Sequence, residues 1–357
     1  MTTLRIDPDR LQPAFDALAS RVGSGRASAA VLAVATSEGV VRTEAFGTVR
    51  GRPVDVADRF LLASVTKPIV ATAVVQLAAG GRISLAEPLR TYLPDLPEGH
   101  AAVTAGHILT HTSGIPDDVF GEWAERAPRD EMVRRAFSRP LDFYPGSRYG
   151  YCSTSFYVLG ELLARIDGIP FEESLRRRVL APMRMGSTSF SALEPAGRWI
   201  PLDGLPQMPS APADALAMLE YMASLAMPGG GLWSTAGDLV RFARAYLHGG
   251  SLDGARLLPP AFVDLIGRER TRGILEPSVD GLAPDRDPHY ALGWGKPGGD
   301  GDVPCSDMAI EHGGISGTRL FIDPATDLAV VVLANRWDVA ETSRSVVVAV
   351  HSALVPA

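Results

Sequence analysis

RFLLASVTKPIV, residues 59–70, places a serine and a lysine three positions apart where an apolar run begins. The run that follows Ser64 predicts a helix that ends at Gly80, with Pro68 in the first turns, where a helix best tolerates proline. Residues three apart lie on one face of a helix, so the Ser64 hydroxyl and the Lys67 amine can meet. The stretch therefore predicts either a helix-capping serine with a surface lysine or a nucleophile with its basic partner.

The composition gives Lys67 more weight than an average lysine. All but two of the 34 Lys and Arg residues are arginine, and the other lysine is Lys296. Arginine keeps its proton in proteins, whereas lysine can become a base when its surroundings favour the neutral amine. A free lysine amine has a pKa of about 10.4, so such a base needs a special environment. A lysine at this position thus favours a chemical role.

The size and charge of the chain restrict its class. Its 357 residues, 46% of them hydrophobic and 21% charged, can bury a large core and exceed one small domain. The net charge of −7 comes from interspersed acids and bases, with no basic block that would indicate a nucleic acid or a membrane surface as partner. We therefore expect a small-molecule substrate, while the oligomeric state is left open.

The N-terminus, the cysteines and the histidines give further expectations. Residues 1–22 lack the features of a secretory signal, and no segment has 18 uninterrupted apolar residues, so we expect a cytoplasmic protein without a membrane span. Cys152 and Cys305 should then be free thiols. His107 and His111 have the spacing of helical metal ligands, but no further ligand cluster accompanies them, so helix packing or capping is expected. We expect no metal and no cofactor.

Strand patterns lie toward both ends of the chain. They are SAAVLAVATSE (28–38), GVVRTEAFGTV (39–49), SGTRLFID (316–323) and LAVVVLAN (328–335). A turn at Glu38-Gly39 joins the first pair into a predicted hairpin, and a Pro-Ala-Thr-Asp turn joins the second. Helices are predicted over residues 1–22, after a Ser-Thr cap at 234–235, and over residues 338–354.

The sequence between these ends is mostly helical or irregular, with residues 195–230 as a long loop or loose helix. This order predicts an α/β (α+β) fold, in which an antiparallel sheet flanked by helices is built from both chain ends and carries an inserted all-helical lobe. Residues 1–82 and 228–357 would form the α/β domain, and residues 83–227 the inserted, mostly helical domain. The active site is expected in the cleft between them.

Two further segments carry candidate functional side chains. PGSRYGYCSTSFYVLGELL puts Tyr151 just before a predicted helix, with small residues that would let it face a cleft. EHGGISGTRLFID puts His312 and two glycines at the approach to a strand, where missing side chains allow close backbone contact with a ligand. Taken singly, the tyrosine also fits a core position and His-Gly-Gly also fits a turn.

Taken together and in order, six segments resemble the serine β-lactamase and penicillin-recognising superfamily. The similarity is greatest to the class C β-lactamase-like branch, which includes D-alanyl-D-alanine peptidases and the family VIII carboxylesterases. The segments are SVTK (64–67), LTHTSGIP (109–116), PGSRYGYCS (145–153), GGGLWSTAGDLVRFARAYL (229–247), YALGWG (290–295) and HGGISG (312–317). They span nearly the whole chain, and their shared order and spacing are more specific than any one of them. The resemblance implies the β-lactamase/transpeptidase-like fold.

The resemblance also implies catalytic roles. Ser64 matches the acylated nucleophile, Lys67 its helical partner, and Tyr151 the tyrosine of the Tyr-x-Asn element. The backbone N–H groups of Ser64 and Ile315 match the oxyanion hole. Whether Lys67 or Tyr151 acts as the base stays open, and a coupled pair of this kind titrates as a unit.

Ser153 and the glycine-rich element His312-Gly313-Gly314 match substrate-binding positions but depart from the family pattern. Ser153 replaces the asparagine that helps to hold a β-lactam side chain. His312 replaces the lysine of the Lys-Thr-Gly element, and a histidine is mostly neutral at pH 7 and therefore a poor clamp for a carboxylate. Both departures favour a neutral ester over a penicillin.

The sequence therefore predicts a serine carboxylesterase that hydrolyses short-chain esters through an acyl-enzyme on Ser64. The alternatives are a β-lactamase or D-alanyl-D-alanine peptidase-like amide hydrolase, an acyltransferase and, more remotely, a non-catalytic protein that binds an acyl ligand. The sequence has no Gly-x-Ser-x-Gly elbow and no Walker A loop, which disfavours an α/β-hydrolase and an NTPase. The physiological substrate, acyl chain length and enantioselectivity are left open.

Overall fold

The structure is a computed structural model of the chain. It describes residues 4–117, 125–193, 198–204, 212–277, 287–299, 303–336 and 340–357.

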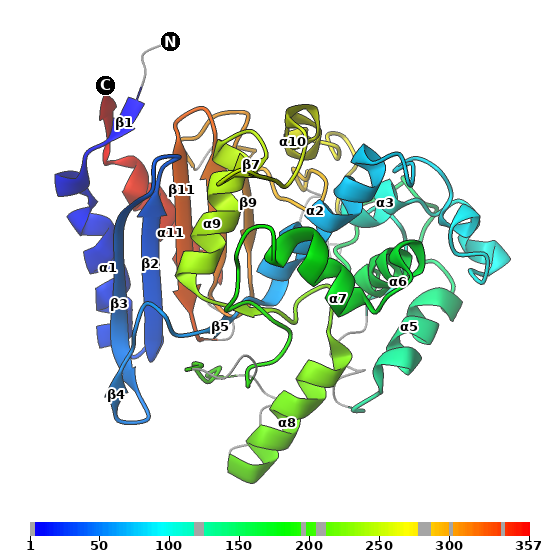
Figure 1. The fold of residues 1–357 in the computed structure, drawn as a ribbon, viewed down its shortest axis with the longest axis horizontal. Helices are drawn as coiled ribbons and strands as arrows, with labels where there is room; N and C mark the ends of the chain where they lie inside the picture. The colour runs from blue at the N-terminus through cyan, green and yellow to red at the C-terminus, as the bar shows by residue number, and fades with distance from the viewer. Residues whose placement is uncertain are drawn as a thin grey trace.

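A six-stranded antiparallel sheet forms one side of the molecule (Figure 1). Its strands, in the order β4-β3-β2-β11-β10-β9, are Arg52–Pro53, Val40–Val49, Ala29–Ala35, Leu328–Ala334, Arg319–Asp323 and Ile310–Gly313. The central strands β2 and β11 pair from Ala30 with Ala334 to Ala35 with Ala329. The expected sheet, assembled from both ends of the chain, is therefore confirmed.

Both predicted hairpins are present. The turn between β2 and β3 lies one residue earlier than expected, because Thr36 and Gly39 exchange backbone hydrogen bonds around Ser37 and Glu38. In the second hairpin, β10 and β11 pair from Arg319 to Asp323, as the sequence pattern predicted.

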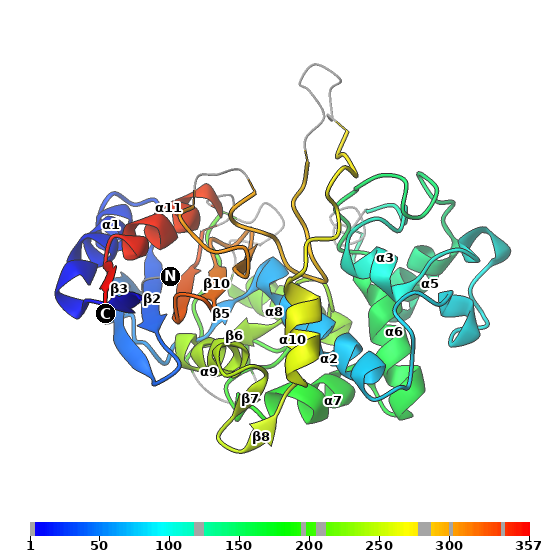
Figure 2. The same ribbon diagram turned by 90° about the horizontal axis from the view of Figure 1, so that it is seen from above.

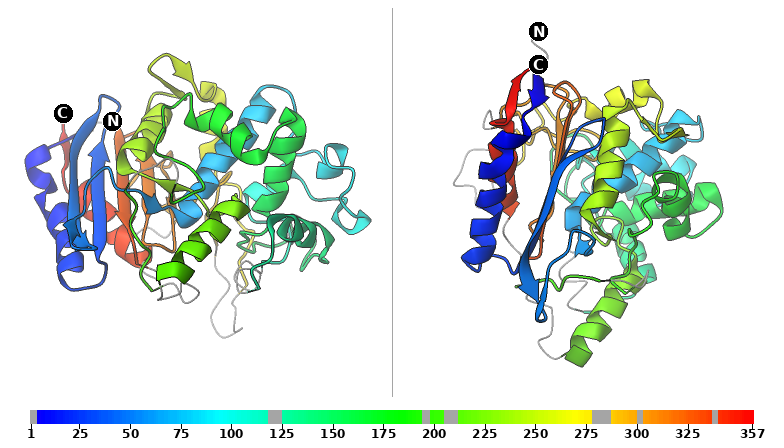
Figure 3. Two further views of the ribbon diagram at one scale, coloured as in Figure 1. Left: turned by 60° about the horizontal axis from the view of Figure 1, so that its bottom comes forward. Right: turned by 60° about the vertical axis from the view of Figure 1, so that its left-hand side comes forward.

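Each face of the sheet is covered by helices, as Figure 3 shows. Helices α1 (Gln12–Gly23) and α11 (Ala340–His351) cover one face, and α9 (Ala236–Leu247) packs on the other. The strand side chains alternate accordingly, so that Leu32 belongs to the core under α1 and α11 and Val31 to the core under α9. Helix α9 begins at the predicted cap, where the Thr235 side chain accepts a hydrogen bond from the Asp238 N–H.

The expected helix over residues 1–22 is partly wrong. Strand β1 (Leu4–Ile6) pairs antiparallel with β12 (Leu354–Pro356), and a short 3-10 helix η1 (Pro8–Leu11) precedes α1. A three-residue strand satisfies its backbone only through its partner, which lies at the other end of the sequence. Likewise, the last helix ends at His351, and β12 replaces the expected final turn.

The segment between the sheet strands is helical. It contains η3 (Leu89–Thr91), η4 (Glu98–His100), α3 (Ala105–Leu109), α5 (Arg129–Ser138), α6 (Phe156–Asp167), α7 (Phe171–Leu175), the π-helix η5 (Arg176–Leu180) and α8 (Pro212–Leu225). Among the described residues of 83–227, no strand longer than an isolated bridge occurs. The proposed division of the chain into two domains stays a prediction.

Helix α2 (Thr66–Ala79) lies between the sheet and the helices α6 and α7 (Figures 1 and 2). It is preceded by the 3-10 turn η2 (Ala63–Val65), which contacts β9, and the helix itself contacts α6 and α10. The remaining elements are β5 (Phe60–Leu61), β6 (Trp233–Ser234), β7 (Ser251–Leu252), β8 (Ala255–Arg256) and α10 (Pro260–Gly267). No described helix combines the length and apolar character that a bilayer crossing requires.

Candidate active site

Ser64 sits in the turn η2, immediately before helix α2. Ala63, the residue before it, has a left-handed φ of 47°, a conformation that costs a non-glycine residue on the order of 1 kcal/mol or more. The N-cap residue of α2 is Val65, and no side chain caps this helix end. The interpretation of Ser64 as a helix-capping serine is therefore wrong.

Lys67 is fully buried, so the interpretation as a surface lysine is also wrong. Its Nζ donates to Ser64 Oγ at 3.1 Å, to Ser153 Oγ at 3.0 Å and to the Gly229 carbonyl at 2.7 Å. Position 229 requires glycine, because an added Cβ would lie 2.8 Å from the Ser153 carbonyl oxygen. The amine is thus held against the candidate nucleophile by three acceptors.

Tyr151 presents its ring to the same amine. Lys67 Nζ lies 4.7 Å from the centroid of the Tyr151 ring and 5.5 Å from that of Phe156, within the range of cation–π attraction. Tyr151 is 37% exposed, so its side chain is accessible to solvent while Lys67 is buried. Its hydroxyl has no hydrogen-bond partner in the described part of the chain, so it is available to a bound molecule.

The backbone after Tyr151 is held by Asp117, which the sequence patterns did not single out. One oxygen of this carboxylate accepts from the N–H groups of Ser153 and Thr154, at 3.0 and 2.9 Å. The turn presents the Ser153 hydroxyl to Lys67 in the place where the family pattern has an asparagine amide. Ser153 therefore keeps a polar contact with the amine despite the smaller side chain.

The segment that contains Ile315 is tied directly to the segment that contains Ser64. Ser316 Oγ donates to the Leu61 carbonyl at 2.8 Å, and Thr318 Oγ1 donates to the Leu62 carbonyl at 2.7 Å. The Ile315 N–H donates to no other group in the described residues. The two proposed oxyanion donors therefore lie on adjoining backbone segments.

His312 is neutral and presents no free ring nitrogen. Burial and the nearby Lys67 ammonium lower the pKa of His312 to about 3. Its Nε2 lies 2.7 Å from the Tyr290 hydroxyl, and its Nδ1 donates to the Gly313 carbonyl at 2.8 Å. The role of His312 as a substrate-binding residue stays a prediction, but a charged carboxylate clamp at this position is disfavoured.

Arg319 is the cationic residue beside His312 in the paired strands, but its side chain lies on the opposite face of the sheet. Arg319 pairs with Gly313 across the strands, and its guanidinium lies 2.7 Å from the Glu311 carboxylate and 3.0 Å from Ser343 of α11. Register alternation places this side chain on the α1 and α11 face of the sheet, opposite to His312. Arg319 is therefore paired with Glu311 on the face of the sheet away from His312.

The two histidines with helical spacing do not share a helix. Helix α3 ends at Leu109, and His111 lies beyond it with a left-handed φ of 56°. His107 caps the start of α3, as its Nδ1 accepts from Thr104 N–H at 3.3 Å, so the expected capping role is confirmed for this residue. His111 instead lies fully buried beside the Tyr151 ring, with centroids 4.3 Å apart.

One group of possible metal ligands lies elsewhere in the described residues. Glu269, Asp287 and His289 place one ligand atom each within 4.8 Å of one another. The Glu269 carboxylate already pairs with Arg272 at 2.9 Å and with His289 at 2.8 Å, so its charge is compensated without an ion. Both cysteines are free thiols, as expected.

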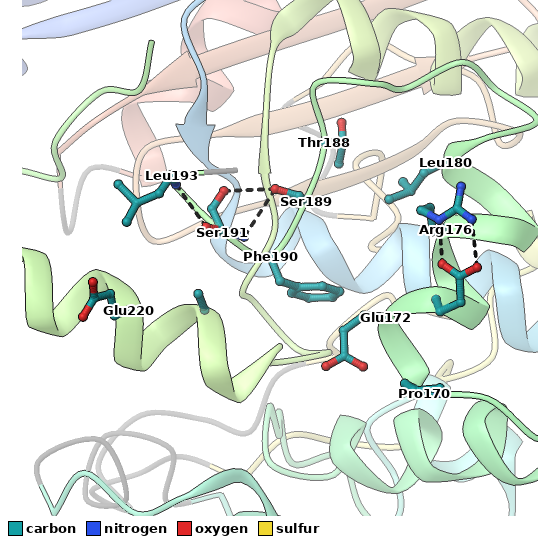
Figure 4. Close-up of a pocket in the computed structure, with 12 residues that line it drawn as sticks. Pro170, Glu172, Arg176, Leu180, Thr188, Ser189, Phe190, Ser191, Leu193 and Glu220 are labelled. Atoms are coloured by element: carbon teal, nitrogen blue, oxygen red, sulfur yellow. Dashed lines mark hydrogen bonds and ion pairs between the residues drawn. The ribbon is translucent and has the colours of Figure 1, made fainter. Parts of the chain in front are cut away.

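A cavity of about 700 Å³ opens between α7, α8 and the segment 188–193, away from Ser64 (Figure 4). Figure 4 shows the Phe190 ring among the lining side chains and Arg176 paired with a neighbouring glutamate. Its lining contains acids, serines and apolar side chains, with no nucleophile and base in contact. Ser64 is not among the residues that line this cavity.

The chain is similar in sequence and in fold to known proteins. The family model described as Beta-lactamase matches residues 15–353. Esterase EstB of Burkholderia gladioli is 30% identical over 331 residues, which cover 80% of this chain and 79% of that protein. N-acetylmuramyl-L-alanine amidase of Bacillus subtilis is 26% identical over 354 residues, covering 86% and 77%. A crystal structure of a family VIII carboxylesterase superimposes with a TM-score of 0.76 at 19% identity, covering 98% of this chain and 99% of that one.

Proposed function

Because the chain belongs to the β-lactamase family, we propose that it is a serine hydrolase that cleaves short-chain carboxylic esters through an acyl-enzyme on Ser64. The observation that carries this proposal is the contact of the buried Lys67 amine with Ser64 Oγ at 3.1 Å. A buried amine held on a serine hydroxyl, at the start of a helix, is the arrangement of an activated nucleophile.

The proposed reaction has two acyl-transfer steps. The Lys67 and Tyr151 pair first lacks one proton, so that it holds either a neutral amine or a phenolate. In this form the pair takes the proton from Ser64 Oγ as this oxygen forms a bond to the ester carbonyl carbon. The oxyanion is stabilised by the N–H groups of Ser64 and Ile315. The C–O bond to the leaving group then breaks, and the alkoxide receives the proton through Tyr151. Water attacks the acyl-enzyme by the same path, which releases the carboxylic acid and restores Ser64.

A neutral substrate is supported by the charges around Ser64. His312 is neutral, both of its nitrogens are bonded within the protein, and Arg319 lies on the other face of the sheet. Lys67, the cation in contact with Ser64, is already held by three acceptors and is therefore a poor partner for a substrate carboxylate. The esterase among the similar proteins, at 30% identity, supports the same class of substrate.

An amide hydrolase is the second candidate, supported by the similarity to N-acetylmuramyl-L-alanine amidase over 86% of the chain. An amide requires protonation of a poorer leaving group, for which the free Tyr151 hydroxyl would serve as donor. The two candidates share the acyl-enzyme and differ in the leaving group, so rates on matched ester and amide substrates distinguish them.

The test uses the full chain with p-nitrophenyl butyrate, nitrocefin and a D-alanyl-D-alanine peptide as substrates. Ser64→Ala should lower turnover of the ester by several orders of magnitude. The control is Ser224→Ala, which removes an exposed hydroxyl that donates to the Tyr221 carbonyl and should keep the wild-type rate. Intact-mass spectrometry after incubation with a fluorophosphonate should show one adduct, absent from Ser64→Ala. Wild-type ester turnover in that variant would rule out the assignment, and faster turnover of the peptide would favour the amidase.

A further inference from the structure

Tyr290 lies between two buried histidines that come from distant parts of the chain. Its Oη is 2.7 Å from His312 Nε2 and 3.3 Å from His111 Nε2. His111 is fully buried, and the other two side chains are each 6% exposed. At the outer ends, His111 Nδ1 is 3.1 Å from the Cys152 N–H, and His312 Nδ1 is 2.8 Å from the Gly313 carbonyl. These contacts form one continuous chain of hydrogen bonds, called the His-Tyr-His chain below.

The backbone groups at the two ends fix the direction of every bond in this chain. An amide N–H only donates, so Cys152 makes His111 Nδ1 an acceptor and places that ring's proton on Nε2. A carbonyl only accepts, so Gly313 places the His312 proton on Nδ1 and leaves Nε2 as an acceptor. The Tyr290 hydroxyl then accepts from His111 and donates to His312. Each ring nitrogen is satisfied once, with both imidazoles neutral.

The His-Tyr-His chain joins two segments of the candidate active site. One end is the backbone between Tyr151 and Ser153, and the other is the carbonyl of Gly313, two residues before Ile315. The His111 ring also lies against the Tyr151 ring, with centroids 4.3 Å apart and planes at 37°. The orientation of His111 therefore sets the position of Tyr151 through both its backbone and its ring.

We propose that Tyr290 is a positioning residue. Through His111 and His312, its single hydroxyl fixes the position of the segment that contains Tyr151 relative to the segment that contains Ile315. The inference rests on the proposed function, because the relative position of the two segments affects catalysis only if both act on one substrate. Phenylalanine at 290 would fill the same space but leave His111 Nε2–H and His312 Nε2 without partners in buried surroundings. The His111 and His312 rings can regain hydrogen-bond partners only by rotating. Such a rotation would displace the two backbone segments to which they are bonded.

The effect is measured by comparing Tyr290→Phe with wild type and with Tyr246→Phe. The control removes the hydroxyl of another buried tyrosine, which lies 2.7 Å from Thr72 Oγ1 and outside the His-Tyr-His chain. Misplacement of reacting groups by up to 1 Å costs as much as about 100-fold, so kcat for p-nitrophenyl butyrate should fall by about 10- to 100-fold in Tyr290→Phe. KM should change little, and the rate of Ser64 labelling by a fluorophosphonate should fall in parallel with kcat.

The control separates positioning from stability. Both variants should lose some thermal stability, but Tyr246→Phe should keep the wild-type kcat below its melting temperature. Equal kcat values in Tyr290→Phe and wild type, or equal losses in the two variants, would overturn the inference while leaving the proposed function intact.

A spectroscopic readout on the wild-type protein needs no variant. Nitrogen-15 NMR of the histidine rings at neutral pH should show His111 as the Nε2–H tautomer and His312 as the Nδ1–H tautomer, both neutral. The opposite tautomer at either ring would overturn the chain of bonds even if Tyr290→Phe failed to fold. If wild type neither hydrolyses the ester nor takes the label, the proposed function fails, and the tautomers alone still show whether the His-Tyr-His chain exists.

Discussion

Gly314→Ala tests the geometry of the oxyanion segment directly. A Cβ at this position would lie 2.2 Å from Thr318 Oγ1 and 2.4 Å from the Leu62 carbonyl oxygen. Neither atom can move away easily, because the Thr318 hydroxyl itself donates to the Leu62 carbonyl at 2.7 Å. Gly314 has no left-handed φ, so space alone and not backbone conformation requires a glycine here.

The magnitude follows from the displacement that these contacts require. Ordinary van der Waals contact begins at 3.4 Å, so the backbone at Gly314 must shift by about 1 Å. The N–H of Ile315, the next residue, shifts with it. A misplacement of about 1 Å costs on the order of 100-fold in rate, which is about 2.7 kcal/mol of transition-state stabilisation. The same overpacking should lower the free energy of unfolding by about 1–3 kcal/mol.

The assay is kcat for p-nitrophenyl butyrate, measured below the melting temperature that circular dichroism gives for each variant. Gly186→Ala is the matched control, because a Cβ there meets nothing within 4 Å, and it should keep the wild-type kcat. A folded Gly314→Ala protein with the wild-type kcat would refute the placement of an oxyanion donor at Ile315.

Lys67→Ala and Tyr151→Phe should each lower kcat by several orders of magnitude, and the double variant should be little slower than the worse single one; additive losses would contradict a pair that acts as one base. Burial and the Lys67 ammonium hold the pKa of His312 in the folded protein at about 3, whereas a histidine in the unfolded chain takes up a proton at about pH 6.5. The free energy of unfolding should therefore fall as the pH decreases from about 6.5 toward 3. In this range His312 should contribute about 1.4 kcal/mol per pH unit to the change in the free energy of unfolding. When denaturant titrations are repeated at several pH values, the slope of this free energy against pH should be smaller by that amount in His312→Asn. Burial raises the pKa of Cys152 to about 12 and that of Cys305 to about 11, so iodoacetamide at about pH 8 should leave both thiols of the folded protein unmodified. Alkylation as fast as that of a free cysteine, seen by intact mass, would contradict the raised pKa values of these thiols.

Local patterns predicted the parts of the fold that local contacts build. The alternation in residues 28–49 predicted the first hairpin, and the Ser-Thr pair before 236 predicted the start of α9. The three-residue spacing of Ser64 and Lys67 predicted their contact, because helix geometry alone brings such side chains together. The roles of these residues in a reaction stay predictions.

Distant pairings escaped the sequence patterns. The residues of strand β1 were predicted as helix. Three residues are too few to show the alternation of apolar and polar side chains that indicates a strand, and their partner β12 lies at the other end of the sequence. His111 was considered for its spacing from His107 and as part of the LTHTSGIP segment, and neither pattern indicated its contact with Tyr290, 179 residues away. Asp117 gave no signal because its hydrogen bonds go to backbone amides, which every sequence has.

The pairing of β2 with β11 also has a consequence for how the protein folds. Ala29 N–H is hydrogen-bonded to the Asn335 side chain across 306 residues of sequence, and the two central strands pair over nearly as long a separation. Contacts of such long range require closure of a large loop before they stabilise the chain, and folding is correspondingly slow. The Ile315 segment lies between β9 and β10 in this sheet, so refolding should restore the helical signal of the chain first and its hydrolytic activity last.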